Sequence, residues 1–463
     1  MKLIYRTKQL MVAGGDMLAF ILSFYLSLSL RYLSLPTWSR IEDHLSPFFF
    51  LFLIWFVINF INGLYDLGRL TNRQTKRRFL ESGLMALLFG IIFFYLIPTN
   101  NSLTPKTILV LNISIGYSLS FVWRLLYNHF IGAKGLHTNV IFIGHNSEVQ
   151  ELIDTIQNNL EGGFKIVAVV DPENTIKPAD FPFFDVYHQI KAIRPAITNH
   201  QANLVVIAPH LRYNQLIVNE LYELLFWKVH LTNLSSFYED VTGRIPPSTF
   251  SESWFLDNLK NREQPIYDKV RELVDILAGL IIGLGFALIF PFVALAIKFS
   301  SRGPIFYKQE RIGQGGKIFY LFKFRSMFAL SADGSAETNG VQFATKGDER
   351  ITKIGRILRR TRLDEVPQFI NLLKRDITLI GPRPERPEII RKLEEKMIFY
   401  SLRHVVKPGL TGWAVIHQNY TDSLEKYLQK LQYDLYYIKN RSLLLDLSIL
   451  LRTVNLIVRL MGQ

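Results

Sequence analysis

The chain has 463 residues, of which 49% are hydrophobic, and a formal net charge of +14 at pH 7. This length allows roughly two to four domains, and the hydrophobic share is high for a soluble globular protein. Because the chain contains no cysteine, a disulfide framework, a thiol nucleophile and a cysteine-ligated zinc site are excluded.

The positive charge is concentrated in the last part of the chain. Residues 265–463 contain 31 Lys and Arg against 19 Asp and Glu, whereas residues 1–264 contain 22 against 20. Such a surplus fits anionic lipid, nucleic acid or phosphorylated small molecules, and charge alone does not choose among them.

Four long apolar runs in the first part of the chain predict a four-helix transmembrane bundle over residues 1–132. Basic residues precede the first run and separate the second from the third, so the positive-inside rule places both ends of the bundle in the cytoplasm. A cleaved signal peptide is a poor alternative, because no small-residue cleavage site follows the first run. The runs are Leu10 to Leu30, Pro47 to Ile61, Phe79 to Ile97 and Thr107 to Ile131.

Asp16 lies inside the first apolar run, beside Gly14 and Gly15. An acidic residue within a membrane helix can mark a functional site. Because Asp16 is near the start of the run, we expect it to have a structural role at the membrane interface.

The chain then alternates strand and helix signals over residues 137–250, which predicts a small parallel-sheet, Rossmann-like domain. Gly144 is the only glycine of a dinucleotide fingerprint, with Asp171 in the position of a ribose-binding acid. Without the other glycines the backbone cannot approach a pyrophosphate closely, so a scaffold or regulatory module is favoured over nucleotide binding. Tyr187 and Lys191 match the Tyr-x-x-x-Lys spacing of sugar-nucleotide dehydratases, a pattern that recurs easily by chance.

A linker over residues 251–264 precedes a charge-free run of 22 residues. Its length is that of a membrane-spanning helix, but Pro291 lies inside it and interrupts helical hydrogen bonding. Lys269 and Arg271 precede the run and Lys298 and Arg302 follow it, so both flanks have the cytoplasmic signature. We therefore predict a re-entrant helix over about residues 269–299 that breaks at Pro291 and returns, with a full crossing as the alternative.

An acidic pair, Asp364 and Glu365, lies in a segment crowded with arginine. Guanidinium groups grip phosphate oxygens in bidentate geometry, and Mg²⁺ binds through one or two carboxylates together with substrate phosphates. The pair therefore predicts metal-assisted phosphate chemistry, in which one carboxylate attacks phosphorus; a capping Asp beside a solvated Glu is the structural alternative. The neighbouring arginines are Arg350, Arg356, Arg359, Arg360, Arg362 and Arg383.

Several motifs in order resemble those of the bacterial sugar transferases, the monotopic polyprenol-phosphate phosphoglycosyl transferases. The motifs are GPIFYKQERIGQGGKIFYLFKFRSM, RLDEVPQ, LIGPRPE, KPGLTGW and DLYYIKNRSLLLDLSILLRT. The resemblance covers about residues 265–463, which it identifies as a mixed α/β catalytic domain, and it also implies the re-entrant helix. The expected fold is thus an α/β membrane protein with a four-helix bundle, a middle domain and this catalytic domain.

The resemblance implies transfer of a hexose 1-phosphate from a UDP-sugar to undecaprenyl phosphate, with release of UMP, to begin exopolysaccharide, capsule or O-antigen assembly. It implies Mg²⁺ as cofactor, held by Asp364 and Glu365, and a covalent phosphosugar on Asp364, with Glu365 as acid/base or metal-assisting partner. Further implied site residues are the phosphate binders and the supporting Asp434 and Pro291. The phosphate binders are Lys323, Arg325, Arg359 and Arg383.

The implied partners are the two substrates and the lipid bilayer, with no nucleic acid, and a homodimer is left open. The catalytic domain is expected on the cytoplasmic face of a bacterial inner membrane. The chain departs from the family pattern at Arg375, where glycine is usual, and at Val415 to Gln418, which includes His417. A sugar-nucleotide dehydratase with tightly bound NAD and a catalytically silent membrane scaffold are the rival functions.

Overall fold

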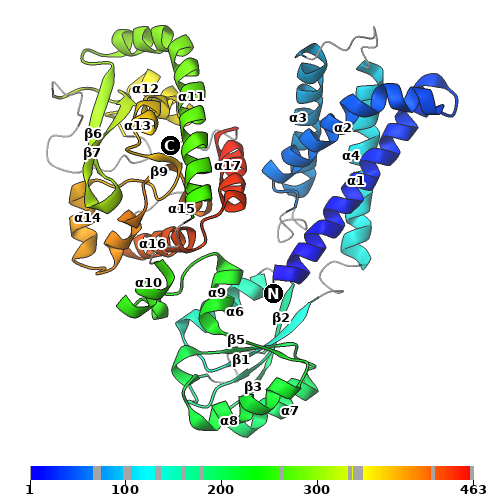
Figure 1. Cartoon of the computed structure of the whole chain (residues 1–463), viewed down its shortest axis with the longest axis vertical. Helices are drawn as coiled ribbons and strands as arrows, with labels where there is room; N and C mark the ends of the chain where they lie inside the picture. The colour runs from blue at the N-terminus through cyan, green and yellow to red at the C-terminus, as the bar shows by residue number, and fades with distance from the viewer. Residues whose placement is uncertain are drawn as a thin grey trace. The chain divides into compact units, whose positions relative to one another are not determined.

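The computed structural model describes residues 2–65, 74–96, 106–130, 137–158, 163–176, 182–259, 264–331, 336, 348–418 and 423–458. The chain divides into two compact units, Met1–Thr242 and Gly243–Gln463 (Figure 1). The first unit contains the predicted bundle and most of the predicted middle domain, whose expected end at residue 250 lies beyond the division. We describe each unit by itself.

The first unit begins with a set of long helices. Their buried face is rich in aromatic side chains such as Phe20, Phe48 and Trp55, whereas Leu18, Phe50 and other large apolar side chains on the outer faces are exposed. In water such exposure is unfavourable, but it suits a helix that faces lipid. The helices are α1 (Lys2–Tyr32), α2 (Trp38–Ile61), α3 (Gln74–Leu96) and α4 (Lys106–Phe130).

Four of the described helices are long and apolar enough to cross a membrane: α1, α2, α4 and the later helix α11 (Pro265–Ser300). The predicted third membrane run does form a helix, α3, but this helix is not among the four. Its first turns contain Lys76, Arg77, Arg78 and Glu81, which shorten its charge-free part.

Asp16 connects α1 to α4 through buried polar contacts. Its Oδ1 atom accepts hydrogen bonds from Arg124 at 2.5 Å and from Ser120 at 2.6 Å. Arg124 also donates to the main-chain carbonyl of Leu64 at 3.1 Å. Asp16 and Arg124 are 0% and 3% exposed, so the charges are paired inside the bundle, as expected for a structural role.

The second part of this unit is a five-stranded parallel sheet of the α/β type, as predicted. The strand order is β3-β2-β1-β4-β5, and every adjacent pair is parallel. The central strands are nearly continuous apolar runs because both faces of the sheet are covered. The strands are β1 (Thr138–Ile143), β2 (Phe164–Val170), β3 (Asp185–Tyr187), β4 (Leu204–Ile207) and β5 (His230–Asn233).

Helices cover both faces of this sheet (Figure 1). The core on one face includes α6 and α9, and the core on the other includes α7 and α8. These helices are α6 (Ser147–Asn158), α7 (Ile193–Asn199), α8 (Gln215–Glu223) and α9 (Leu234–Thr242), with single 3₁₀ turns η4 (Ile190–Ala192), η5 (Pro209–Leu211) and η6 (Leu224–Phe226).

The second unit combines short sheets with helices around its own core, in which Tyr400, Leu435 and Tyr437 are buried. Strands β6 (Phe306–Ile312) and β7 (Ile318–Phe324) form an antiparallel hairpin, and β8 (Thr378–Ile380) pairs in parallel with β9 (Gly409–Thr411). The remaining elements are η7 (Pro247–Thr249), α10 (Glu252–Leu259), α11 (Pro265–Ser300), η8 (Gln314–Gly316), α12 (Lys353–Thr361), η9 (Leu363–Gln368), α13 (Phe369–Leu373), α14 (Pro387–Glu394), η10 (Tyr400–Val405), α15 (Trp413–His417), α16 (Leu424–Lys439) and α17 (Leu443–Val458).

The predicted linker contains a folded element. Helix α10 occupies residues Glu252–Leu259, and its Phe255 is buried in the core of the second unit with Tyr400 and Leu435. Ile245 belongs to the same core. The chain therefore joins the packed second unit well before residue 264.

Helix α11 runs without interruption from Pro265 to Ser300, with Pro291 inside it. The predicted break of the helix at Pro291 is wrong: the ribbon bends between a longer and a shorter part but remains helical (Figure 1). A proline inside a helix removes one hydrogen bond and displaces one carbonyl, and a kink accommodates both effects. The exposed side chains of Ile281, Leu288 and Phe292 leave an apolar surface along the helix.

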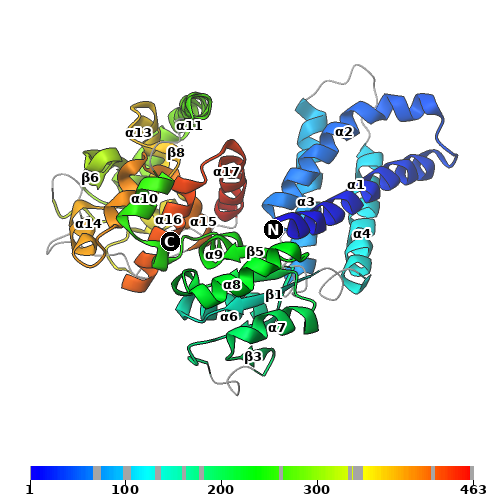
Figure 2. The same cartoon turned by 60° about the horizontal axis from the view of Figure 1, so that its bottom comes forward.

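Glycines bring α11 close to the helix that follows the acidic pair. A Cβ atom on Gly279 would lie 2.8 Å from Leu373, and one on Gly283 would lie 3.0 Å from Phe369. Figure 2, in which α11 is seen nearly end-on, shows α13 beside it. The acidic pair therefore lies only a few residues along the chain from α13, which packs against the apolar helix α11.

Candidate active site

The acidic pair lies in a 3₁₀ turn between two helices. Helix α12 ends at Thr361 and is followed by Arg362, which adopts the left-handed conformation with φ of 57°. Asp364 and Glu365 lie in the first turn of η9. Pro367 is inside η9, and α13 continues from Phe369. The pair thus lies in a 3₁₀ turn that leads directly into α13.

Glu365 is surrounded by cations. Its Oε1 atom accepts hydrogen bonds from Arg383 at 2.5 Å and from Lys323 at 3.2 Å, and its Oε2 atom is 3.7 Å from Arg362. Burial alone would raise the pKa of Glu365, but the charges of Arg383, Lys323 and Arg362 outweigh it and hold the pKa well below its usual range. Glu365 is therefore ionised at neutral pH.

Asp364 is buried, with 8% of its surface exposed, yet its carboxylate has no hydrogen bond or ion pair with any residue that the structure describes. Burial raises the pKa of Asp364 to about 6, and the adjacent charge of Glu365 adds to the rise. At neutral pH the group is a desolvated carboxylate that no described residue contacts by a hydrogen bond or ion pair, which is the state expected of an attacking group.

The structure brings together three of the four predicted phosphate binders. Lys323, from β7, and Arg383, in the turn after β8, meet at Glu365. Arg359, in α12, donates through Nε to Ser326 at 2.8 Å, and its charge acts on Asp364. The sequence analysis named Arg362 among the arginines near the acidic pair but gave it no role in the site; its position as the first residue of RLDEVPQ was the available signal.

Arg325 lies apart from this cluster. It is 2% exposed, and its guanidinium donates to the main-chain carbonyls of Ile297, Ser301 and Arg302 at the end of α11. Arg325 comes directly after strand β7, and its side chain points toward the end of α11, whereas that of Lys323 points toward Glu365. Arg325 therefore caps α11, which is a structural role.

Asp434 does not contact the acidic pair either. It is 1% exposed in α16 and pairs with Arg403 at 2.7 Å, and Arg403 also donates to the main-chain carbonyl of Arg383 at 2.9 Å. Asp434 is thus linked to the main chain of Arg383 through Arg403. The sequence analysis missed Arg403, although it lies close before the KPGLTGW motif.

The donor set fits a divalent cation at one carboxylate only. Asp364 is available as a ligand, whereas both oxygens of Glu365 face cations. No group of three or more His, Cys, Asp or Glu side chains gathers among the described residues. A cation here would need phosphate oxygens and water to complete its coordination, as is usual for Mg²⁺.

The family departures have local explanations in the structure. Arg375 adopts the left-handed conformation with φ of 65°, which glycine adopts without strain, and it pairs with Glu272. His417 stacks on the ring of Tyr433 with ring centroids 5.1 Å apart and contacts Trp413. His417 is thus part of an aromatic stack.

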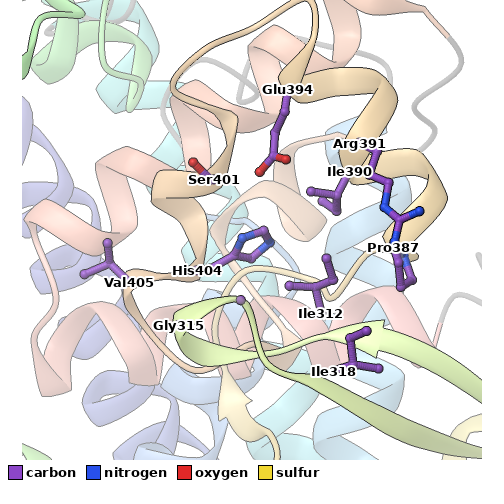
Figure 3. A pocket seen from close by; sticks show the side chains of 11 residues that line it. Ile312, Gly315, Ile318, Pro387, Ile390, Arg391, Glu394, Ser401, His404 and Val405 are labelled. Carbon is purple, nitrogen blue, oxygen red and sulfur yellow. The ribbon is translucent and has the colours of Figure 1, made fainter.

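A hollow of about 490 Å³ lies at the turn of the β6–β7 hairpin, and neither residue of the acidic pair lines it. Glu394, Ser401 and His404 point toward it above the glycine turn of Gly315 (Figure 3). None of the predicted site residues lines it, and burial lowers the pKa of His404 to about 4, which leaves its imidazole neutral at physiological pH.

The first unit shows little support for a dehydratase site. Tyr187 is in strand β3 and Lys191 in the turn η4, so the pair does not share a helix. A Cβ atom on Gly144 would lie 2.7 Å from Leu211 and 2.8 Å from Ala208, so side chains occupy the space beside this turn. Asp171 accepts a hydrogen bond from the main chain of Ile176 at 2.8 Å, which makes it a loop-forming residue.

Together, the cation cluster around the acidic pair and the long apolar helices are those of a membrane-associated protein with a cationic candidate site. Comparison with known proteins gives the particular family. The chain belongs to the bacterial sugar transferases: the profile of that family matches residues 266–460, and a UDP-glucose:undecaprenyl-phosphate glucose-1-phosphate transferase from Caulobacter vibrioides is 37% identical over 189 residues, 40% of this chain and 69% of that protein.

Two further relatives extend this result. A UDP-N-acetylgalactosamine-undecaprenyl-phosphate N-acetylgalactosaminephosphotransferase from Aeromonas hydrophila is 38% identical over 229 residues, 50% of this chain and 52% of that protein. An undecaprenyl-phosphate glucose phosphotransferase from Komagataeibacter xylinus is 28% identical over 352 residues, 73% of this chain and 64% of that protein. The chain thus spans less than two thirds of either of these two relatives.

Proposed function

We propose that this protein transfers a hexose 1-phosphate from a UDP-sugar to undecaprenyl phosphate and releases UMP. The names of the relatives give the substrate class. The observation that favours this chemistry most is the contrast within the acidic pair: Glu365 holds three cations, while Asp364 beside it has no partner among the described residues.

In the proposed first step, a carboxylate oxygen of Asp364 attacks the β-phosphorus of the UDP-sugar. The bond between this phosphorus and the bridging oxygen breaks, and the electron pair leaves with UMP. Lys323, Arg359 and Arg383 balance the charge that develops on the phosphate oxygens. Because Glu365 stays ionised, its proposed role is to hold Lys323 and Arg383 in place, and it does not donate a proton.

In the proposed second step, a phosphate oxygen of undecaprenyl phosphate attacks the phosphorus of the phosphosugar on Asp364. The acyl-phosphate bond breaks, Asp364 is regenerated as a carboxylate, and the lipid diphosphate sugar is released. When Mg²⁺ is bound, it would neutralise phosphate charge, and Asp364 is the residue here that fits as its ligand. The acceptor lipid fits the apolar surface of α11.

We further propose that α11 enters the bilayer and returns, so that the catalytic unit remains on the cytoplasmic face of the inner membrane. Basic residues on both sides of the charge-free run, Lys269 and Lys298 among them, support this orientation. The bend in α11 (Figure 1) gives the helix a shape compatible with return to the same face. In this location the enzyme would begin the assembly of a lipid-linked exopolysaccharide, capsule or O-antigen.

A trapping experiment tests the covalent mechanism. Purified full-length protein is mixed with each of a panel of UDP-sugars without lipid acceptor and quenched rapidly. We expect one hexose phosphate on the protein, mapped to Asp364 by peptide mass spectrometry, and parallel initial-rate lines in the complete reaction. Asp364→Asn should lose adduct and turnover together.

The rival mechanisms give different outcomes. Direct attack by the lipid phosphate would give no adduct and intersecting initial-rate lines. A dehydratase would contain tightly bound NAD, and a catalytically silent scaffold would bind UDP-sugar without releasing UMP. Either of the last two results would contradict the proposed function itself.

A further inference from the structure

The turn that presents Arg383 is fixed by donors from outside it. The segment Gly381 to Glu385 contains Pro382 and Pro384, which have no main-chain N–H, so the turn has few donors of its own. Four successive carbonyls, of Pro382, Arg383, Pro384 and Glu385, nevertheless each accept a hydrogen bond. Their donors are the main chain of Gly409 at 3.0 Å, Arg403 at 2.9 Å, Arg311 at 2.9 Å and the main chain of Ile312 at 3.0 Å.

Among these donors, Arg403 acts on the residue that contacts Glu365. It is 1% exposed, and its guanidinium contacts three acceptors in different directions. Asp434 accepts from Nε at 3.1 Å and from a terminal nitrogen at 2.7 Å, Tyr400 accepts from the other terminal nitrogen at 3.1 Å, and the carbonyl of Arg383 completes the set. A lysine ammonium keeps the charge but has a single nitrogen, so it does not reproduce the planar fork by which separate guanidinium nitrogens donate to these acceptors.

Burial makes this arrangement rigid. Removing one partner of a buried charge pair leaves the other uncompensated, so Asp434 and Arg403 keep each other in place. The main-chain carbonyl of Arg383 accepts a hydrogen bond from Arg403, and the guanidinium of Arg383 contacts Glu365 at 2.5 Å. Arg403 therefore fixes the main chain of Arg383, and Glu365 contacts the side chain of the same residue.

We propose that Arg403, fixed by Asp434, is a positioning residue for phosphate transfer: it sets the main chain of Arg383 so that the Arg383 guanidinium is oriented before substrate binds. The inference rests on the proposed function. Arg403 does not touch the substrate. Arg403 acts through Arg383: by fixing its main chain in advance, Arg403 lowers the free-energy cost of ordering the Arg383 side chain in the transition state.

A double-mutant cycle tests this inference. Arg383→Lys keeps the charge but loses the planar fork, and we expect UMP release to fall at least about tenfold. Arg403→Lys should give a loss of similar size. Because Arg403 acts through Arg383, the double variant should be little worse than Arg383→Lys alone, whereas independent effects would multiply.

Arg391→Lys is the matched control, because Arg391 is exposed in α14 and its side chain forms no hydrogen bond or ion pair in the described part of the chain. It should retain wild-type rates. Asp434→Asn is taken through the same cycle, so that a failure of Arg403→Lys to fold does not remove the test. Thermal midpoints in detergent are measured for each variant, and rates are given per folded protein.

The outcomes separate the inference from the function on which it rests. Wild-type protein that neither binds UDP-sugar nor releases UMP would overturn the proposed function. Wild-type activity together with multiplicative losses in the cycle, or with unchanged rates in Arg403→Lys and Asp434→Asn, would overturn the positioning role alone. Losses that do not multiply, in folded variants, are the expected result.

Discussion

Two adjacent carboxylates differ in this protein because their neighbours differ. Glu365 is ionised and held by three cations, whereas the pKa of Asp364 is raised to about 6. If Asp364 is the attacking group, the rate of adduct formation should rise about tenfold per pH unit below pH 6 and level off above it. Quenched-flow measurement of the adduct between pH 5 and pH 8 checks this profile. A rate that is flat across that range would contradict it.

The same pKa predicts how stability changes with pH. The pKa of Asp364 is higher in the folded protein than the unfolded value of about 3.9, so the folded state binds more protons and stability falls as pH rises from about 4 through 6. Asp364→Asn removes this loss. The variant should be more stable than wild type on the order of 2 kcal/mol at pH 7.5, and the two should converge near pH 4. Thermal melts at both pH values measure the difference.

The sequence predicted the acidic pair and named Asp434 as a supporting residue, but it did not show which contacts link Asp434 to the pair. Asp364, Glu365 and Arg383 were predicted from their clustering with arginine, because charge type and spacing are visible in a sequence. Arg325 was misplaced since the end of strand β7 at Phe324 turns its guanidinium toward α11. Arg403 was missed because its role depends on a main-chain carbonyl, which no sequence pattern displays.

At the scale of elements, the end of α11 depends on Arg325. Three main-chain carbonyls accept from this buried guanidinium, and their loss would leave buried acceptors unpaired. Arg325→Met should therefore lower the free energy of unfolding by about 2 kcal/mol or more. The rate of UMP release per folded molecule should remain near that of wild type, because Arg325 is apart from the acidic pair. A normal melting temperature with a lost rate would instead indicate a phosphate-binding role.

The path of α11 through the membrane is tested with single cysteines, since the chain has none of its own. Lys317 is exposed in the hairpin turn, and Lys317→Cys should react with an impermeant thiol reagent only after the inner membrane is permeabilised. Leu35 is 76% exposed between α1 and α2, and Leu35→Cys should react in intact spheroplasts. Labelling of both sites in intact spheroplasts would favour a full crossing by α11.

For the whole molecule, two compact units with separate cores predict two separate unfolding transitions. Asp16→Ala leaves Arg124 buried without its ion-pair partner, which should destabilise the bundle by about 3–5 kcal/mol. Calorimetry in detergent should show one transition shifted down and the other unchanged, along with an unchanged temperature of inactivation. Ser118→Ala, on the exposed side of α4, is the control and should shift neither transition.

The larger elements were predictable where hydrophobic patterning is strong. The parallel sheet was predicted because its central strands are nearly uniform in apolar residues, and the apolar runs formed long helices. The assignment of residues 251–264 as a linker did not anticipate α10, since the burial of Phe255 depends on residues near position 400. Local composition contains no information about a partner so distant in sequence.

The charge count at the acidic pair has a consequence for turnover. Lys323, Arg359, Arg362 and Arg383 bring four positive charges to two carboxylates, Asp364 and Glu365, which leaves an excess of two. This fixed positive charge favours a site with a bound doubly charged anion over a site without a ligand, as in ion exchange. In the proposed cycle each phosphate ester that leaves is replaced by another. We therefore expect the site to hold a phosphate ligand through most of the cycle.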